Sequence, residues 1–225
     1  MYKKEVLRAR WTDNSLIELT YPSATSESGE AASQYAAIRQ AVSWPGVGIS
    51  GAVTVLARPY NKVDPGSEEL VLLAESVHPQ ADLSSLFNKV ADLSEMFLAS
   101  PVYLDVGDPC TEALLDFVQS RNLQIRWVEA PLVGDLFASL SQVKGLISKG
   151  VLRLDPGSES FKQATTISWA DLEEGRDAMR RKFPLIESLR FTVAAFVRFP
   201  PARIRRGGRL PEKPGTSDST KWMER

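Results

Sequence analysis

Short apolar runs alternate with amphipathic segments across residues 101–156, and this alternation most narrows the folds open to the chain. The runs with strand character lie at 102–105, 123–129 and 151–155, and those with apolar residues at helical spacing lie at 110–121 and 136–149. Strands that alternate with helices are typical of a parallel sheet with helical crossovers. The segment therefore predicts a βαβαβ unit in an α/β fold.

Each of the three predicted strands ends with a carboxylate, namely Asp105, Glu129 and Asp155. In open α/β sheets, ligands bind outside the carboxyl ends of the strands, so these acids are candidates for a functional site. Asp105 is the strongest candidate. For Glu129 the alternative is an exposed loop residue, since most acids are simply solvated.

Asp108 follows Asp105 closely and precedes Pro109. It can assist Asp105 as a metal ligand, but aspartate before proline is also typical of a helix N-cap with proline in the first turn. Glu187 lies in an apolar predicted helix. It can act as a ligand, or it can pair with Arg190 three residues later on the same helix face, which is the favoured reading.

Further elements surround this unit. A hairpin is predicted for 4–21, an alanine-rich helix for 31–42, strands for 47–58 and 69–77, an amphipathic helix for 82–97, a charged surface helix for 169–182 and an apolar helix for 184–196. The strands at 47–58 and 69–77 are predicted to form a second hairpin, and two hairpins before a βαβαβ segment predict a mixed sheet flanked by helices. We expect an N-terminal hairpin and helix extension at 1–45, the sheet domain at 46–200 and a tail at 201–225.

The net charge of −1 gives the chain no overall attraction to nucleic acid or to anionic membranes. No apolar run is long enough to span a membrane, and we expect a cytoplasmic protein without membrane partners. The one basic cluster lies in the tail and comprises Arg203, Arg205, Arg206 and Arg209. This cluster predicts contacts with nucleic-acid phosphates, and the alternative is a soluble, flexible end.

Nucleophilic catalysis is not favoured. His78 is the only histidine and precedes Pro79 without a supporting motif. Cys110 is the only cysteine, which excludes an intramolecular disulfide and makes a zinc site unfavourable.

Residues 47–196 resemble the C-terminal nuclease domain of tailed-phage terminase large subunits, which is ribonuclease H-like. The resemblance is carried by the glycine-rich run GVGISG at 46–51, by VYLD ending at Asp105, by the stretches 112–128 and 140–154, and by FPLIESLRF at 183–191. It implies a ribonuclease H-like mixed sheet. It also implies a partner complex of viral or mobile-element origin.

That family holds two divalent metal ions, Mg²⁺ or Mn²⁺, with acids from the first strand, the central strand and the last helix. Two metals can activate water and stabilise the leaving oxygen of a phosphodiester. In this sequence the first-strand position is Ser50 and the last-helix pair is Phe183 and Pro184. Asp105 alone matches, and Glu187 is a displaced substitute.

Two readings follow from the resemblance. The first is a ribonuclease H-like domain that has lost its metal site and serves as a nucleic-acid-associated or assembly subunit, which the missing acids favour. The second is an active metal-dependent nuclease, with Asp105 and Asp108 as metal ligands and Glu129 and Glu187 as further catalytic acids. A packaging ATPase is excluded for this chain, since it has no G-x-x-x-x-G-K-[ST] phosphate loop.

Overall fold

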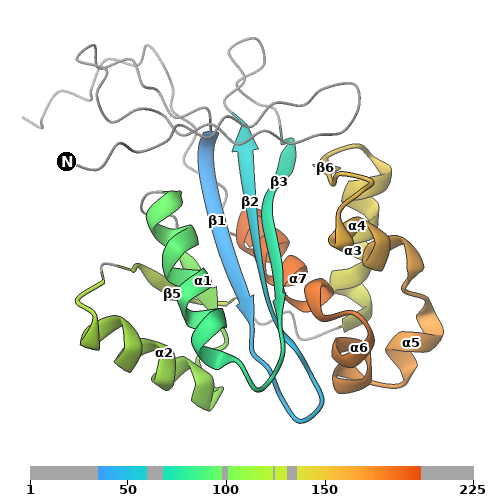
Figure 1. Ribbon diagram of the computed structural model, residues 1–225. Helices are drawn as coiled ribbons and strands as arrows, with labels where there is room; N and C mark the ends of the chain where they lie inside the picture. Colours follow the sequence, from blue (N-terminus) through green and yellow to red (C-terminus); the bar gives the residue numbers. More distant parts are fainter. Residues whose placement is uncertain (1–34, 60–67, 98–100, 124, 131–135, 199–225) are drawn as a thin grey trace, which may run out of the picture.

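The computed structural model describes residues 35–59, 68–97, 101–123, 125–130 and 136–198 (Figure 1). Its strands are β1 Tyr35–Ser43, β2 Gly51–Pro59, β3 Leu70–His78, β4 Val102–Leu104, β5 Trp127–Glu129 and β6 Leu152–Arg153. Its helices are α1 Leu83–Met96, α2 Pro109–Ser120, α3 Leu136–Ser148, α4 Glu159–Thr166, α5 Trp169–Glu173, α6 Arg176–Lys182 and α7 Pro184–Arg198.

The strands form one mixed sheet in the order β5-β4-β1-β2-β3-β6. β1, β2 and β3 form an antiparallel meander, β4 pairs parallel to β1, and β5 pairs parallel to β4. β6 pairs parallel to β3 at the other edge. This is the ribonuclease H-like arrangement with one added edge strand, so the predicted fold class is confirmed.

Alternation along the strands divides the core between the two faces of the sheet. Val53 and Val55 of β2 pack with α1 and α2, whereas Leu56 packs with α3 to α7. Successive side chains of a strand point to opposite faces, so a nearly continuous apolar run serves both layers. In Figure 1, α1 and α2 lie on one side of the strands and α7 lies behind them.

The helix predicted for residues 31–42 is wrong over its described part, because Tyr35–Ser43 is a strand. Ala41 and Val42 are both fully buried, since β1 has β2 on one side and β4 on the other. Pairing on both edges outweighs the helix propensity of alanine. This strand belongs to the sheet although it precedes residue 45, and the division of the chain into domains stays a prediction.

The predicted βαβαβ unit is correct only in its first half. β4, α2 and β5 form a parallel crossover, but β6 pairs with β3 rather than with β5. The charged helix predicted for 169–182 is two helices, α5 and α6, which meet at Gly175 with φ +94°. The hairpin predicted for 4–21 and the tail lie outside the described residues. No helix of the described part is long and apolar enough to cross a membrane.

Candidate functional site

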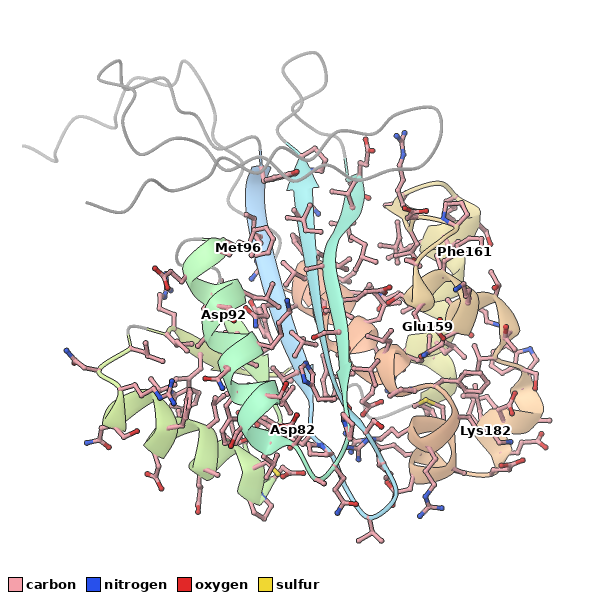
Figure 2. The ribbon with its side chains drawn as sticks, in the orientation of Figure 1. Asp82, Asp92, Met96, Glu159, Phe161 and Lys182 are labelled. Atoms are coloured by element: carbon pink, nitrogen blue, oxygen red, sulfur yellow. The ribbon has the colours of Figure 1, made fainter. Side chains whose placement is uncertain are left out.

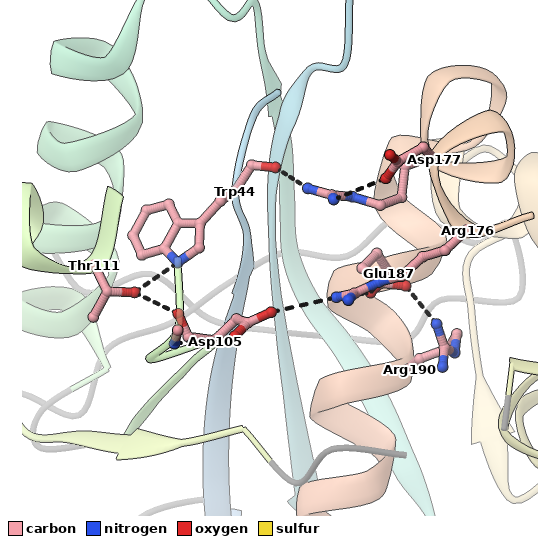
Figure 3. Close-up of polar contacts among 9 residues, drawn as sticks. Trp44, Asp105, Thr111, Arg176, Asp177, Glu187 and Arg190 are labelled. Carbon is pink, nitrogen blue, oxygen red and sulfur yellow. Dashed lines mark hydrogen bonds and ion pairs between the residues drawn. The ribbon is translucent and has the colours of Figure 1, made fainter. Parts of the chain in front are cut away.

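Five of the six strands run in the same direction, so their carboxyl ends lie along one edge of the sheet. Only β2 runs the other way. Asp105 follows β4 at this edge, and the first turn of α7 and the first residue of α6 lie beside it (Figure 3). Tyr103 packs against Phe191 of α7, so alternation along the strand places Asp105 on the α7 face as well.

The Asp105 carboxylate has a partner for each oxygen. Oδ1 accepts a hydrogen bond from the backbone N–H of Gly107 at 3.2 Å, and Oδ2 accepts one from Nη2 of Arg176 at 3.5 Å. The first contact is an Asx turn, which fixes the loop that leaves the strand. The second joins β4 to α6.

The backbone of Asp105 is held from the other side of the sheet. Its carbonyl accepts a hydrogen bond from Thr111 Oγ1 at 2.6 Å, and Thr111 in turn accepts one from the indole N–H of Trp44 at 2.8 Å. Trp44 is 2% exposed and follows β1 directly. The end of β1, the end of β4 and the start of α2 are therefore fixed to one another.

Glu187 in the first turn of α7 is 1% exposed and binds two arginines. Its Oε1 accepts a hydrogen bond from Nε of Arg176 at 2.6 Å and forms an ion pair with Nη2 of the same arginine at 2.5 Å, and its Oε2 accepts a hydrogen bond from Nη1 of Arg190 at 2.5 Å. Arg190 also donates to Ser139 Oγ at 2.6 Å. The predicted pairing of Glu187 with Arg190 is confirmed, and a buried carboxylate needs such partners because an isolated buried charge is costly.

Arg176 bridges the two carboxylates. Its Nη2 lies 2.5 Å from Glu187 Oε1 and 3.5 Å from Asp105 Oδ2. Burial lowers the pKa of Arg176, but the charges of Glu187 and Asp105 and the hydrogen bonds to them raise it above its usual value on balance. Two acids and two arginines thus form a formally neutral cluster: Asp105, Glu187, Arg176 and Arg190.

Helix α6 is fixed to the sheet at more than one point, which holds Arg176 in place. Arg180 donates to the carbonyl of Trp44 at the end of β1, and an ion pair at 3.6 Å with Asp177 of the same helix orients its side chain (Figure 3). Met179 is fully buried in the core on the α7 face.

Asp108 is the N-cap of α2. Its Oδ1 accepts from the backbone N–H of Cys110 at 2.9 Å, and Pro109 is the first helical residue. Burial and this neighbouring carboxylate raise the pKa of the Cys110 thiol to about 11. The helix-capping reading of Asp108 is confirmed, and its role as a metal ligand stays a prediction.

Glu129 is exposed at the end of β5 and pairs with Leu104. Paired residues of neighbouring strands share a face, and Leu104 packs with α1 and α2. The structure thus brings together Asp105 and Glu187 but places Glu129 on the other face of the sheet. The basic cluster Arg203, Arg205, Arg206 and Arg209 lies outside the described residues.

The first-strand position of the resemblance is not Ser50, which precedes β2. β1 is the strand that pairs with β4, at Gln40↔Val102 and Ala41↔Tyr103. Continuing this register places Ser43 level with Asp105. Ser43 is 2% exposed, and its hydroxyl has no hydrogen-bond partner among the described residues.

Sequence reasoning missed Arg176, which lies in a charged run that was assigned to the solvated surface. The signal that points to such a residue is Glu187 itself, because a glutamate within an apolar helix requires a cation from elsewhere in the chain. The pattern does not say which of the nearby arginines and lysines supplies it.

His78 at the end of β3 lies between two serines. Its Nδ1 is 3.0 Å from Ser85 Oγ and its Nε2 is 3.0 Å from Ser76 Oγ, and burial lowers its pKa. Both ring nitrogens are thus engaged within β3 and α1, on elements that do not contribute to the cluster around Arg176.

The side chains of the cluster do not fit a two-metal centre as they are placed. Within the described residues, no three His, Cys, Asp or Glu side chains lie close enough to hold a metal ion together. Both carboxylate oxygens of Glu187 and the Oδ2 oxygen of Asp105 already contact arginine nitrogens. A divalent ion between these acids would lie against a guanidinium of the same sign.

No protein-family model matches the sequence, and no curated protein matches it. Among solved structures, the chain is similar to the magnesium-bound large terminase nuclease of thermophilic phage G20c, with 11% identity, TM-score 0.48 and coverage of 70% of this chain and 80% of that one. For the manganese-bound nuclease domain of the bacteriophage SPP1 large terminase, the values are 14%, 0.48, 72% and 86%. For the Thermus phage P74-26 large terminase nuclease domain they are 12%, 0.48, 71% and 79%.

Proposed function

We propose that this chain is a ribonuclease H-like domain that does not cleave phosphodiesters and that acts as a nucleic-acid-associated or assembly subunit of a viral or mobile-element complex. One observation carries the first half of this proposal: Arg176 neutralises Asp105 and Glu187, the two acids that converge at the carboxyl edge of the sheet. A catalytic metal would have to displace a guanidinium that the chain itself holds in place.

The wider surroundings of the cluster support the same conclusion. Ser43, level with Asp105 on the neighbouring strand, offers a hydroxyl where a third carboxylate would complete a metal site. Divalent ions such as Mg²⁺ prefer carboxylate ligands, and a neutral hydroxyl adds no charge to hold them. The association with nucleic acid is proposed to involve Arg203, Arg205, Arg206 and Arg209, through contacts with phosphates.

An active nuclease is the alternative, and the convergence of Asp105 and Glu187 from β4 and α7 favours it. In this case Mg²⁺ or Mn²⁺ would bind Asp105 and Asp108 after Arg176 had moved away, with Glu187 as a further catalytic acid. A catalytic role for Glu129 would require it to leave the face of the sheet that it shares with Leu104. Carboxylates of this kind supply the oxygen ligands that such ions require.

A cleavage assay separates the two candidates. Single- and double-stranded DNA and RNA are incubated with the full chain in millimolar Mg²⁺ or Mn²⁺, beside Asp105→Asn as the matched variant. We expect no metal-dependent cleavage above that of Asp105→Asn. Cleavage that needs Mn²⁺ and disappears in a folded Asp105→Asn variant would establish the nuclease instead.

A further inference from the structure

We infer that the Arg176 guanidinium is a built-in substitute for a divalent cation, and that its removal leaves a weak cation site between Asp105 and Glu187. This inference rests on the proposed function, because a chain that already binds a catalytic metal there would have no need of the arginine. The residues that carry it come from three separate elements: the end of β4, the start of α6 and the first turn of α7.

A single nitrogen makes the decisive contacts. Nη2 of Arg176 touches an oxygen of Asp105 and an oxygen of Glu187, so one positive group lies between two carboxylates that are far apart in the sequence. A surface ion pair joins one acid to one base and contributes little. Here the same group instead links two acids, one of which is 1% exposed.

The acids remain oriented when the Arg176 side chain is removed. Asp105 is fixed by Gly107 and by the contact of its carbonyl with Thr111, and Glu187 keeps its bond to Arg190. Removing the guanidinium frees Asp105 Oδ2 and Glu187 Oε1. These oxygens, with two negative charges against the single charge of Arg190, are suitable ligands for a hard divalent ion.

The site around Arg176 is open to solvent, and α6 has contacts with the rest of the protein that do not involve Arg176. The Arg176 side chain is 44% exposed and that of Asp105 is 27% exposed, so water can reach the pair and complete the coordination of an ion. Helix α6 stays anchored through the buried Met179 and through the contact of Arg180 with Trp44. An alanine at position 176 therefore removes the cation without removing its helix.

The test compares the thermal midpoint of the full chain in EDTA and in millimolar Mn²⁺, with bound Mn²⁺ counted by electron paramagnetic resonance. The variants are wild type, Arg176→Ala, the double variant Arg176→Ala with Asp105→Asn, and Arg181→Ala as an exposed arginine on the same helix. Arg176→Gln is the second variant, in case the alanine variant does not fold.

We expect Arg176→Ala to bind about one Mn²⁺ and to gain about 2–4 °C in Mn²⁺, the shift for a ligand at several times its Kd in a chain of this length. Wild type and Arg181→Ala should show neither effect, and Asp105→Asn should abolish both in the double variant. If the Arg176→Ala and Arg176→Gln variants fold but neither bind Mn²⁺ nor gain thermal stability in it, this inference is overturned and the proposed function is not. Asp105-dependent Mn²⁺ binding by the wild type would overturn the proposed function as well.

Discussion

The cluster of two acids and two arginines at the carboxyl ends of the strands is held by ion pairs, and replacing one member of a pair leaves the other without that partner. Glu187 is 1% exposed and Arg190 is 3% exposed, so the ion pair between them is buried on both sides, and Glu187 is paired with Arg176 as well. Replacing a buried ion pair as a whole can be neutral, but removing one member is strongly destabilising. The cluster is therefore sensitive to single substitutions.

Glu187→Gln removes the carboxylate that pairs with both Arg176 and the buried Arg190, and we expect it to lower the free energy of unfolding by about 3 kcal/mol. Urea denaturation at neutral pH measures this loss. Glu174→Gln is the control, since Glu174 forms only an exposed ion pair with Lys182 and its loss should cost at most about 0.5 kcal/mol. Equal midpoints for the two variants would contradict the role given to Glu187.

Cys110 should react slowly with thiol reagents at pH 8. Its pKa of about 11 leaves roughly a thousandth of the thiol ionised there, and the thiolate is the reactive form. The rate of reaction with a disulfide reagent is therefore expected to rise tenfold per pH unit well beyond pH 9. Asp108→Asn, which keeps an N-cap but removes the charge, should speed the reaction. A plateau near pH 9 in the wild type would disprove the raised pKa.

At the scale of the elements, the sequence predicted those with a local signal more reliably than those decided by their neighbours in the sheet. Asp82 and Asp108 mark the starts of α1 and α2, because a side-chain oxygen that accepts a backbone N–H is a local signal. β1 has no such signal. Its alanines are compatible with a helix, and the pairing with β2 on one side and with β4, which is distant in sequence, on the other decides the outcome.

The break between α5 and α6 is another feature that the sequence did not predict, because the charged run at 169–182 is typical of one continuous surface helix. Gly175 has φ +94°, a backbone conformation that residues with a side chain rarely adopt, and it directly precedes Arg176. The glycine therefore separates α5 from α6 and places Arg176 at the first position of α6.

Gly175→Ala should lower the free energy of unfolding by about 1–2 kcal/mol, although its Cβ would meet open space, because the strain lies in the backbone. Gly145→Ala is the matched control: it lies within α3, its Cβ would also meet nothing, and alanine there should stabilise by about 0.5–1 kcal/mol. Urea denaturation of both variants measures the two changes. Effects of the same sign would refute the explanation by backbone strain.

For the molecule as a whole, the sequence predicted the class of the sheet but not the order of all its strands. The pairing of β2 with β3, the amphipathic helix α1 and the crossover from β4 to β5 follow from local patterns. The placement of β6 beside β3 does not follow from a local pattern, because an apolar residue such as Leu152 is compatible with either edge strand of the sheet. Its site is decided by the packing of Leu152 and Leu154 with the helices on the α7 face.

Stability should be distributed across the sheet in the same way as the pairing. β2 has strands on both sides, and Ala52, Val53, Leu56 and Ala57 are fully buried, whereas β6 is an edge strand joined at Leu70↔Leu152 and Val71↔Arg153. We expect the amides of β2 to exchange hydrogen only by global unfolding and those of β6 by local opening. Native-state exchange measured across low urea concentrations tests this, since only global unfolding depends steeply on urea. Equal protection and equal urea dependence in β2 and β6 would mean that the edge strand unfolds only with the whole sheet, and that the two-residue pairing underestimates how firmly the α7 layer holds it.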